Sequence, residues 1–254
     1  MSTSAPTVLV SGGASGLGEA VARRSDHDGW RVVVIDRDGE RARAVARSLK
    51  DGAAITVDVT DADAVDAAFE AVVADGHTLR LVVSCAGIGP PERLLSRRGA
   101  HSIQTFNTVL SVNLFGTFHL LRAAAVAMAQ NELDEHGQRG VIVNTASVAA
   151  YEGQIGQVAY AASKGAVVAM TLPAARDLAD RLIRVCTIAP GLFRTPMLAA
   201  LPQEAQDSLA ASVPNPARLG EPDEYAALVA HIQANPMLNG EVIRLDGALR
   251  MAPR

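Results

Sequence analysis

The stretch Ser11-Gly12-Gly13-Ala14-Ser15-Gly16-Leu17-Gly18 lies between an apolar run, Thr7–Val10, and a helical pattern that begins at Glu19. Glycines in such a turn let the backbone approach a ligand closely, and the N-terminus of the following helix presents N–H donors and a partial positive charge. The glycine spacing differs from the common G-x-G-x-x-G, and a Gly-rich turn alone is also typical of an ordinary strand-to-helix loop. Its place after the first apolar run favours a pyrophosphate-binding loop.

Asp36 supports this interpretation because it follows Gly18 by 18 residues and ends the second apolar run. A carboxylate there would accept hydrogen bonds from an adenosine ribose diol and would repel a 2′-phosphate, which favours NAD over NADP. Two alternatives stay open at this point. Arg37 could bind a 2′-phosphate, and Asp36 could simply be an acidic residue at a helix N-terminus.

The rest of the chain alternates short apolar runs with Ala-rich helical patterns such as Glu40–Leu49, Ala62–Val73 and Thr108–Ala129. Apolar residues on successive positions indicate strands buried on both faces, and strand–helix alternation indicates a parallel sheet with right-handed connections. We therefore expect a single α/β domain over residues 1–254, a doubly wound Rossmann fold with helices on both faces. The expected strands are Thr7–Val10, Arg31–Ile35, Ala53–Val57, Leu79–Ser84, Val141–Thr145, Arg184–Ile188 and Glu241–Leu245.

Composition narrows the function classes. The chain has 254 residues, a net charge of −4 and 20% charged residues, which argues against disorder and against a protein that coats nucleic acid. Two cysteines exclude a disulfide framework, and the scattered histidines give no metal-ligand spacing. The stretch Gly99–Leu121 lacks charged residues, but its polar side chains favour a buried helix over a membrane span.

Three segments are longer than plain connections: residues 88–102, Gln130–Gly140 and 192–220. Ligands bind beyond the carboxyl ends of strands in such sheets, so the first and third are expected to contact substrate. The third carries Met197, Leu198 and Leu201, which suit an acyl chain or a sterol.

Tyr160 and Lys164 are spaced i, i+4, which places them on one helix face, and Ser147 follows the fifth expected strand. With three Tyr and two Lys in the chain, a chance Tyr-x-x-x-Lys is expected roughly 0.02 times. A nearby ammonium would lower the pKa of a phenol, and Ser147 would hold the oxygen of a carbonyl or alcohol. Of the 23 basic residues 21 are Arg, so a Lys at this position indicates a chemical requirement for an ammonium group.

These residues and their order resemble the short-chain dehydrogenase/reductase superfamily along essentially the whole chain. Within it the chain is similar to the type-II 3-hydroxyacyl-CoA dehydrogenases, relatives of 17β-hydroxysteroid dehydrogenases. The segments that carry this resemblance are GGASGLG at residue 12, GQRGVIVNTASVAAYEGQIGQ at 137, SKGAVVAMTLPAARDLA at 163, TIAPGLF at 187 and LNGEVIRLDGALRM at 238.

The resemblance implies a seven-stranded parallel sheet, a homotetramer and reversible oxidation of (S)-3-hydroxyacyl-CoA to 3-ketoacyl-CoA. It implies a catalytic set of Asn113, Ser147, Tyr160 and Lys164, in which Asn113 helps to hold a proton-relay water and Ser147 and Tyr160 contact substrate. For NAD, the residues implied by the glycine loop and the resemblance together are Gly12, Ser15, Gly16, Leu17, Gly18, Asp36, Asp58, Val59, Cys85, Ala86, Gly87, Tyr160, Lys164, Pro190, Gly191, Phe193 and Thr195.

The chain departs from the superfamily at Ser84, where Asn is usual, so a strand-linking hydrogen bond must be made by a hydroxyl or lost. The N-terminus has no secretory or Arg-rich leader pattern, and with the Arg and Ala bias this suggests a bacterial cytoplasm. Arg93, Arg97 and Arg98 cluster in an otherwise acidic chain. Arg97 and Arg98 could bind CoA phosphates, or they could form a solvated face or a subunit contact.

Two other functions remain open. One is an NAD-dependent hydroxysteroid or other secondary-alcohol dehydrogenase. The other is a nucleotide-binding scaffold without catalysis, which would not need Tyr160 and Lys164.

Overall fold

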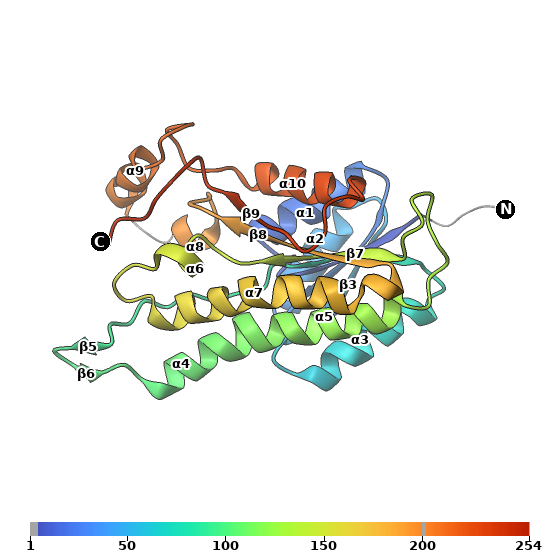
Figure 1. Ribbon diagram of the computed structural model, residues 1–254, viewed down its shortest axis with the longest axis horizontal. Coiled ribbons are helices and arrows are strands. Elements are labelled where there is room, and N and C mark those ends of the chain that lie inside the picture. Colours follow the sequence, from blue (N-terminus) through green and yellow to red (C-terminus); the bar gives the residue numbers. More distant parts are fainter. Residues whose placement is uncertain (1–4, 200–201, 254) are drawn as a thin grey trace.

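The computed structural model describes residues 5–199 and 202–253, and it contains a seven-stranded parallel sheet in the order β3-β2-β1-β4-β7-β8-β9 (Figure 1). This confirms the doubly wound fold. Each strand matches an expected run within two residues. The strands are β1 Thr7–Ser11, β2 Arg31–Asp36, β3 Gly52–Thr56, β4 Leu79–Ser84, β7 Gly140–Thr145, β8 Ile183–Pro190 and β9 Val242–Leu245.

Helices cover both faces of this sheet, and the alternation of side chains along each strand divides the core in two. Val8 and Val10 of β1 face one core, formed with α1, α2 and α10, whereas Leu9 faces the other, formed with α3, α5 and α7. The helices of these layers are α1 Gly16–His27, α2 Gly39–Arg47, α3 Ala62–Ala74, α5 Gly116–Met128, α7 Val158–Asp177 and α10 Pro222–Ala234.

The expected helix Thr108–Ala129 is longer and less regular than its pattern suggests. It begins as α4, Ile103–Leu110, passes through a π-helical turn at Ser111–Phe115 and continues as α5. One side of it is buried against the sheet, but Phe115, Phe118 and Val126 are exposed. The prediction of a buried helix is therefore correct for one face only.

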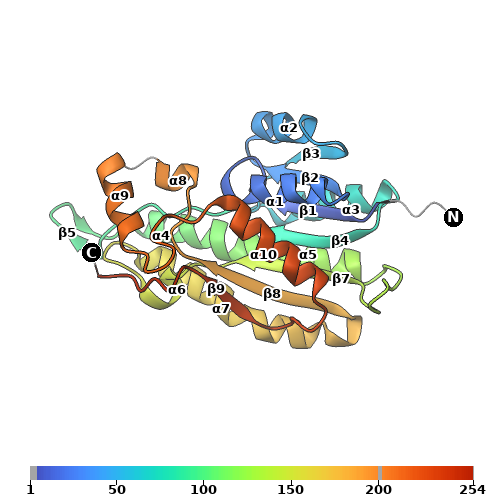
Figure 2. The same ribbon diagram turned by 90° about the horizontal axis from the view of Figure 1, so that it is seen from above.

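Two extensions project beyond the carboxyl ends of the strands, at the left of Figures 1 and 2. The first is a hairpin of β5, Leu95–Ser96, and β6, Gly99–Ala100, which periodicity did not indicate. The second holds α8, Pro196–Ala199, and α9, Gln203–Ala211. The remaining short elements are α6, Ala149–Glu152, and a 3-10 turn at Ala179–Arg181.

Candidate active site

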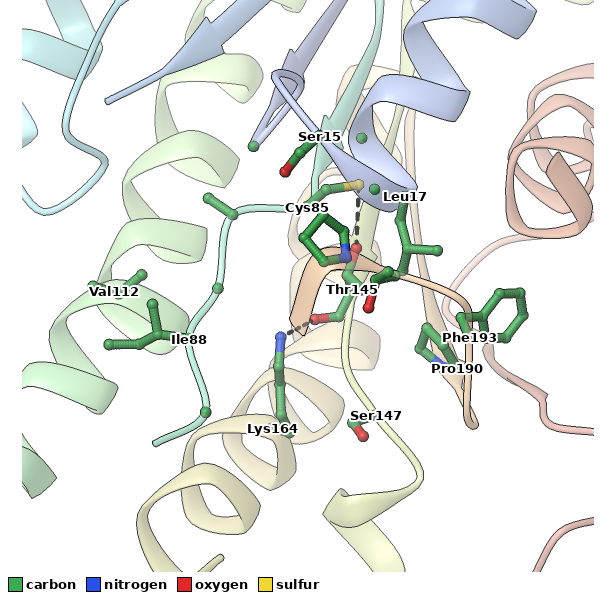
Figure 3. A pocket seen from close by; sticks show the side chains of 18 of the residues that line it. Ser15, Leu17, Cys85, Ile88, Val112, Thr145, Ser147, Lys164, Pro190 and Phe193 are labelled. Atoms are coloured by element: carbon green, nitrogen blue, oxygen red, sulfur yellow. Dashed lines mark hydrogen bonds between the residues drawn. The ribbon is translucent and has the colours of Figure 1, made fainter. Parts of the chain in front are cut away.

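A cavity of about 550 Å³ opens at the carboxyl ends of the central strands and extends to α8 of the second extension. Every residue predicted to bind the cofactor lines it, as do Ser147, Tyr160 and Lys164. Figure 3 shows part of this lining, including Ser147 and Lys164. Asn113 is the exception, since it lies behind the wall and is fully buried. The lining also includes Ile88, Val112, Thr145, Gln157 and Met251, which the sequence did not single out.

The glycine loop has the close packing that a phosphate site requires. Gly12 has a φ of +63°, and a Cβ there would lie 2.7 Å from the backbone nitrogen of Ala86. A Cβ on Gly18 would collide with the carbonyl oxygen of Gly12. The helix begins at Gly16, three residues earlier than expected, so its free N–H groups face the cavity edge where Ser15 and Leu17 lie. The loop therefore fits the pyrophosphate of a dinucleotide.

Asp36 is fixed at the far end of this cavity. One carboxylate oxygen accepts a hydrogen bond from the Ala14 backbone nitrogen at 3.2 Å, and the other accepts one from Asp38 at 3.0 Å. This arrangement holds the carboxylate beside the glycine loop, where a ribose would lie. Arg37 also lines the cavity.

Asp58 and Val59 form the wall beyond β3. Asp58 accepts hydrogen bonds from the backbone and the hydroxyl of Thr60, and the backbone bond is the main reason that the pKa of Asp58 is lowered. Val59 packs against Gly116, where a Cβ would approach its side chain within 3.0 Å. This wall of the cavity is thus closely packed.

Tyr160 and Lys164 project from α7, and Ser147 stands in the turn after β7. Burial raises the pKa of Tyr160, while its hydrogen bond with Ser147 opposes that rise. The expectation that an ammonium lowers this pKa is not met, because burial is the main influence on it and the Lys164 Nζ lies 5.8 Å from the ring centroid. Tyr160 is therefore a neutral phenol at neutral pH.

Lys164 is itself nearly enclosed, with 4% of its surface exposed. Its ammonium donates to the Thr145 carbonyl oxygen at 2.7 Å, a contact drawn in Figure 3. Burial lowers the pKa of Lys164 to about 8. The group is charged at neutral pH and becomes neutral only slightly above it.

Asn113 sits in the π-helical turn and connects two parts of the site. Its Oδ1 accepts from the Ile88 backbone nitrogen at 2.8 Å, and its Nδ2 donates to the Ile88 carbonyl and to the Ser163 hydroxyl. Both amide hydrogens are therefore committed. A relay water at Asn113 has to use the second lone pair of Oδ1 or the main-chain carbonyl, so this predicted role remains a prediction.

A buried cluster beneath the cavity was missed by sequence reasoning. The hydroxyls of Thr145 and Tyr225 lie 2.7 Å apart, and the Cys85 sulfur contacts both, at 3.7 and 3.8 Å. Burial raises the pKa of Cys85, so this thiol stays protonated. No short motif could have identified Tyr225, because it comes from α10 and reaches the cavity floor only in the folded chain.

The sequence left open whether the Ser84 hydroxyl makes the strand-linking hydrogen bond. Within the described residues this hydroxyl has no hydrogen-bond partner. It pairs in register with Asn144, whose side-chain amide also lacks partners there. The strand-linking hydrogen bond is lost at this position.

The residues that follow β8 form the cavity wall that faces Ala86 and Gly87. Ala86 and Gly87 lie across from Pro190, Gly191, Phe193 and Thr195. Gly191 is required because a Cβ there would lie 2.8 Å from the side chain of Asp246. Leu198 also lines the cavity. Leu201 and the side chain of Met197 lie outside what the structure describes.

A dinucleotide-sized cleft with a Ser, Tyr and Lys set at its centre defines an oxidoreductase that uses a nicotinamide cofactor. Comparison with known proteins agrees, since the profile of the short chain dehydrogenase family matches residues 6–206. The chain belongs to this family, the short-chain dehydrogenases/reductases, and it is an oxidoreductase.

Individual relatives are similar over nearly their whole length. The chain is 52% identical to "3-hydroxyacyl-CoA dehydrogenase type-2" of Drosophila melanogaster over 248 residues, covering 96% of this chain and 97% of the relative. It is 50% identical to the protein of that name from Homo sapiens, covering 96% and 95%. The crystal structure of 3-hydroxyacyl-CoA dehydrogenase type-2 from Mycobacterium avium superposes with a TM-score of 0.91 at 43% identity, covering 98% and 97%.

Proposed function

We propose that this enzyme interconverts (S)-3-hydroxyacyl-CoA and 3-ketoacyl-CoA with NAD, as a step of fatty-acid or branched-chain acyl-CoA oxidation. The observation that carries the proposal is the convergence of Ser147, Tyr160 and Lys164 in one cavity, in a chain about half identical to relatives that bear this activity in their names. The nucleotide-binding scaffold is disfavoured, because it gives no reason to bury an ammonium group beside a phenol.

The chain's own residues fit a dinucleotide. The glycine loop with the start of α1 would hold the pyrophosphate, and Asp36 would accept hydrogen bonds from the adenosine ribose. A bound nicotinamide cofactor supplies hydride exchange with the substrate carbon. We assign NAD because the anchored carboxylate of Asp36 would repel a 2′-phosphate at close range.

Ser147 and Tyr160 both face the place that a carbonyl oxygen would occupy. The Ser147 hydroxyl can donate to that oxygen while its own oxygen accepts from the Ala149 backbone nitrogen at 3.1 Å. The neutral Tyr160 phenol donates its proton to the oxygen during reduction and accepts it back during oxidation. Lys164 supplies positive charge near the phenolate that reduction leaves behind.

The β5–β6 hairpin supports a substrate that carries phosphate. Its base is fixed, since the Glu92 backbone nitrogen donates to the Gly156 carbonyl at 2.8 Å beside the start of α7. Its tip presents Arg97 and Arg98, which are exposed and make no hydrogen bond through their guanidinium groups with other described residues. Free guanidinium groups on a hairpin that leaves the cavity wall after Gly89 are suited to bidentate contact with CoA phosphates.

The test is an absorbance assay with acetoacetyl-CoA and NADH, run beside NADPH and beside a steroid ketone. Rapid oxidation of NADH with the thioester is the expected result. Asp36→Asn should reduce the preference for NADH over NADPH by about tenfold, since the repulsive charge is removed. Turnover of the steroid ketone alone would instead establish the alternative, a hydroxysteroid or other secondary-alcohol dehydrogenase.

We also propose a homotetramer in a bacterial cytoplasm. Exposed apolar side chains on the π-helical turn, on α5 and on α7 are candidates for contact with a second copy, among them Phe115, Phe118, Val158 and Leu172. The bacterial assignment rests on the bias of the composition toward Arg and Ala. Light scattering of the purified protein tests the assembly, and a mass near one chain of 26.5 kDa would contradict it.

A further inference from the structure

The segment after β9, residues 249–253, is held against the active site as a strap. In both ribbon views this dark red segment runs toward the end of the molecule where α6 lies (Figures 1 and 2). Leu249 is 1% exposed and anchors its start. The chain reverses just before it through Gly247 and Ala248, with φ values of 58° and 65°. A left-handed φ is unfavourable for Ala, so the surrounding contacts must stabilise this turn.

Backbone hydrogen bonds fix the strap along the turn that follows α6. The Ile155 nitrogen donates to the Pro253 carbonyl at 3.1 Å, and the Gln154 side chain donates to the Ala252 carbonyl at 2.9 Å. The Met251 nitrogen donates to a carboxylate oxygen of Glu152 at 2.9 Å. The strap is therefore attached to the piece of chain that begins at Ser147.

Glu152 connects this attachment to the edge of the sheet. Arg244 of β9 donates to both oxygens of Glu152, at 3.0 and 3.3 Å, and also to Asp246 at 2.7 Å and to the Leu249 carbonyl at 3.0 Å. The hydrogen bond from Arg244 is the main reason that the pKa of Glu152 is lowered. The carboxylate stays charged and bound over the neutral range.

Met251 is the strap residue that reaches the cavity. It lines the same space as Ser147, Val148, Ala149 and Gln157, on the side away from the glycine loop. That is where the group attached to the reacting carbon has to lie when its oxygen sits between Ser147 and Tyr160. A thioether side chain is apolar and adaptable, which suits contact with an acyl chain.

Building on the proposed function, we infer that Met251 is a specificity-determining wall for the acyl group and that Glu152 is the positioning residue that holds it there. The strap limits the length or branching of the acyl chain, rather than taking part in proton transfer. Removing the Met251 side chain should open space for longer acyl groups. Weakening the hydrogen bonds of Glu152 should also raise activity toward longer acyl groups, but with less discrimination among them.

The experiment compares kcat/KM for acetoacetyl-CoA and 3-ketooctanoyl-CoA. Met251→Ala should shift the ratio toward the longer substrate by about tenfold, the size of effect that one or two methylene groups have in an apolar pocket. Met251→Leu, of similar volume, should leave the ratio within about twofold. Met237→Ala is the matched control, because Met237 is 90% exposed and lies outside the cavity lining.

Glu152→Gln tests the positioning role with a readout besides activity. Hydrogen exchange at the Met251 and Ile155 amides should become faster, while the affinity for NADH, measured by fluorescence, should remain unchanged. An unaltered substrate ratio in Met251→Ala, with acetoacetyl-CoA still turned over, would overturn the inference and leave the proposed function intact. No turnover of either thioester by the wild-type enzyme would overturn the proposed function itself.

Discussion

The interior and the rim of the cavity hold their polar groups differently. In the interior, Asn113 and Lys164 are buried and form hydrogen bonds with backbone atoms of neighbouring segments, and the buried Thr145 hydroxyl bonds to the Tyr225 hydroxyl. At the rim, Arg97 and Arg98 stand on an exposed two-stranded hairpin, and α9 has no buried residue. The interior geometry is set by folding, whereas the rim is free to adjust to a ligand.

This difference indicates that the interior performs proton transfer and the rim recognises the substrate. Proton transfer needs a fixed distance between donor and acceptor, which a rigid interior provides. Recognition of a long, flexible substrate needs charge and apolar surface, which the exposed rim can supply. Substitutions in the interior should therefore act on kcat, and those at the rim on KM.

The largest effect should come from Tyr160→Phe, which removes the proton donor and keeps the ring. We expect kcat to fall by about 10³-fold, within the range for loss of general acid–base catalysis, with little change in the melting temperature. Tyr151→Phe is the matched control, since Tyr151 is 48% exposed and does not line the cavity. Retention of more than a tenth of the activity in Tyr160→Phe would assign the proton to another group.

Lys164→Met should reduce activity strongly and yet stabilise the fold. The pKa of Lys164 falls from 10.5 to about 8 on folding, so the charged lysine destabilises the native state at pH 7 by about 3 kcal/mol. The pH dependence follows from proton linkage. Between pH 8 and 10.5 the unfolded chain binds more protons at Lys164 than the native state does, so the free energy of unfolding of the wild type rises with pH relative to that of the variant.

Denaturant melts of wild type and Lys164→Met at several pH values would test this. Lys50→Met is the control, because the chain's other lysine is exposed. A Lys164→Met variant that is less stable at every pH would show that the ammonium group is better accommodated than its burial indicates.

A moderate effect should appear at the rim in the double variant Arg97→Gln/Arg98→Gln. The KM for acetoacetyl-CoA should rise by about tenfold at low salt, and by less at high salt because surface charges are screened. The value of kcat should stay the same. Arg47→Gln/Arg176→Gln removes the same charge from exposed positions outside the cavity lining. Equal KM values for the two double variants would make the hairpin arginines a solvated face or a subunit contact.

The smallest effect should come from Ser84→Ala, which removes a buried hydroxyl that makes no hydrogen bond within the described interior. Ser84 is 2% exposed and its hydroxyl has no partner among the described residues, so removal of the hydroxyl should cost less than about 1 kcal/mol or be slightly stabilising. Chemical denaturation would measure it. A loss well above that value would indicate that a buried water joins Ser84 to Asn144.

Much of this arrangement could be predicted from the sequence, because the strands are continuous apolar runs and the cofactor loop is local. Asp36, Tyr160 and Lys164 were predicted correctly as cavity residues because short-range spacing places them. Tyr225 and Met251 could not be found. Tyr225 meets the cavity residue Thr145 only through the packing of α10, and Met251 reaches the cavity only through the pairing of β9 with β8. The π-helical turn at Asn113 leaves no signal in apolar periodicity, and the raised pKa of Tyr160 depends on burial.

The salt bridge between Arg244 and Glu152 joins segments 92 residues apart. During synthesis, the glycine loop, β7 and α7 can all assemble before β9 leaves the ribosome, but α6 then lacks its ionic partner. Contacts of such long sequence separation form late because closing the intervening loop costs entropy. The enzyme's ability to discriminate among acyl groups should therefore be the last property that a newly made chain acquires.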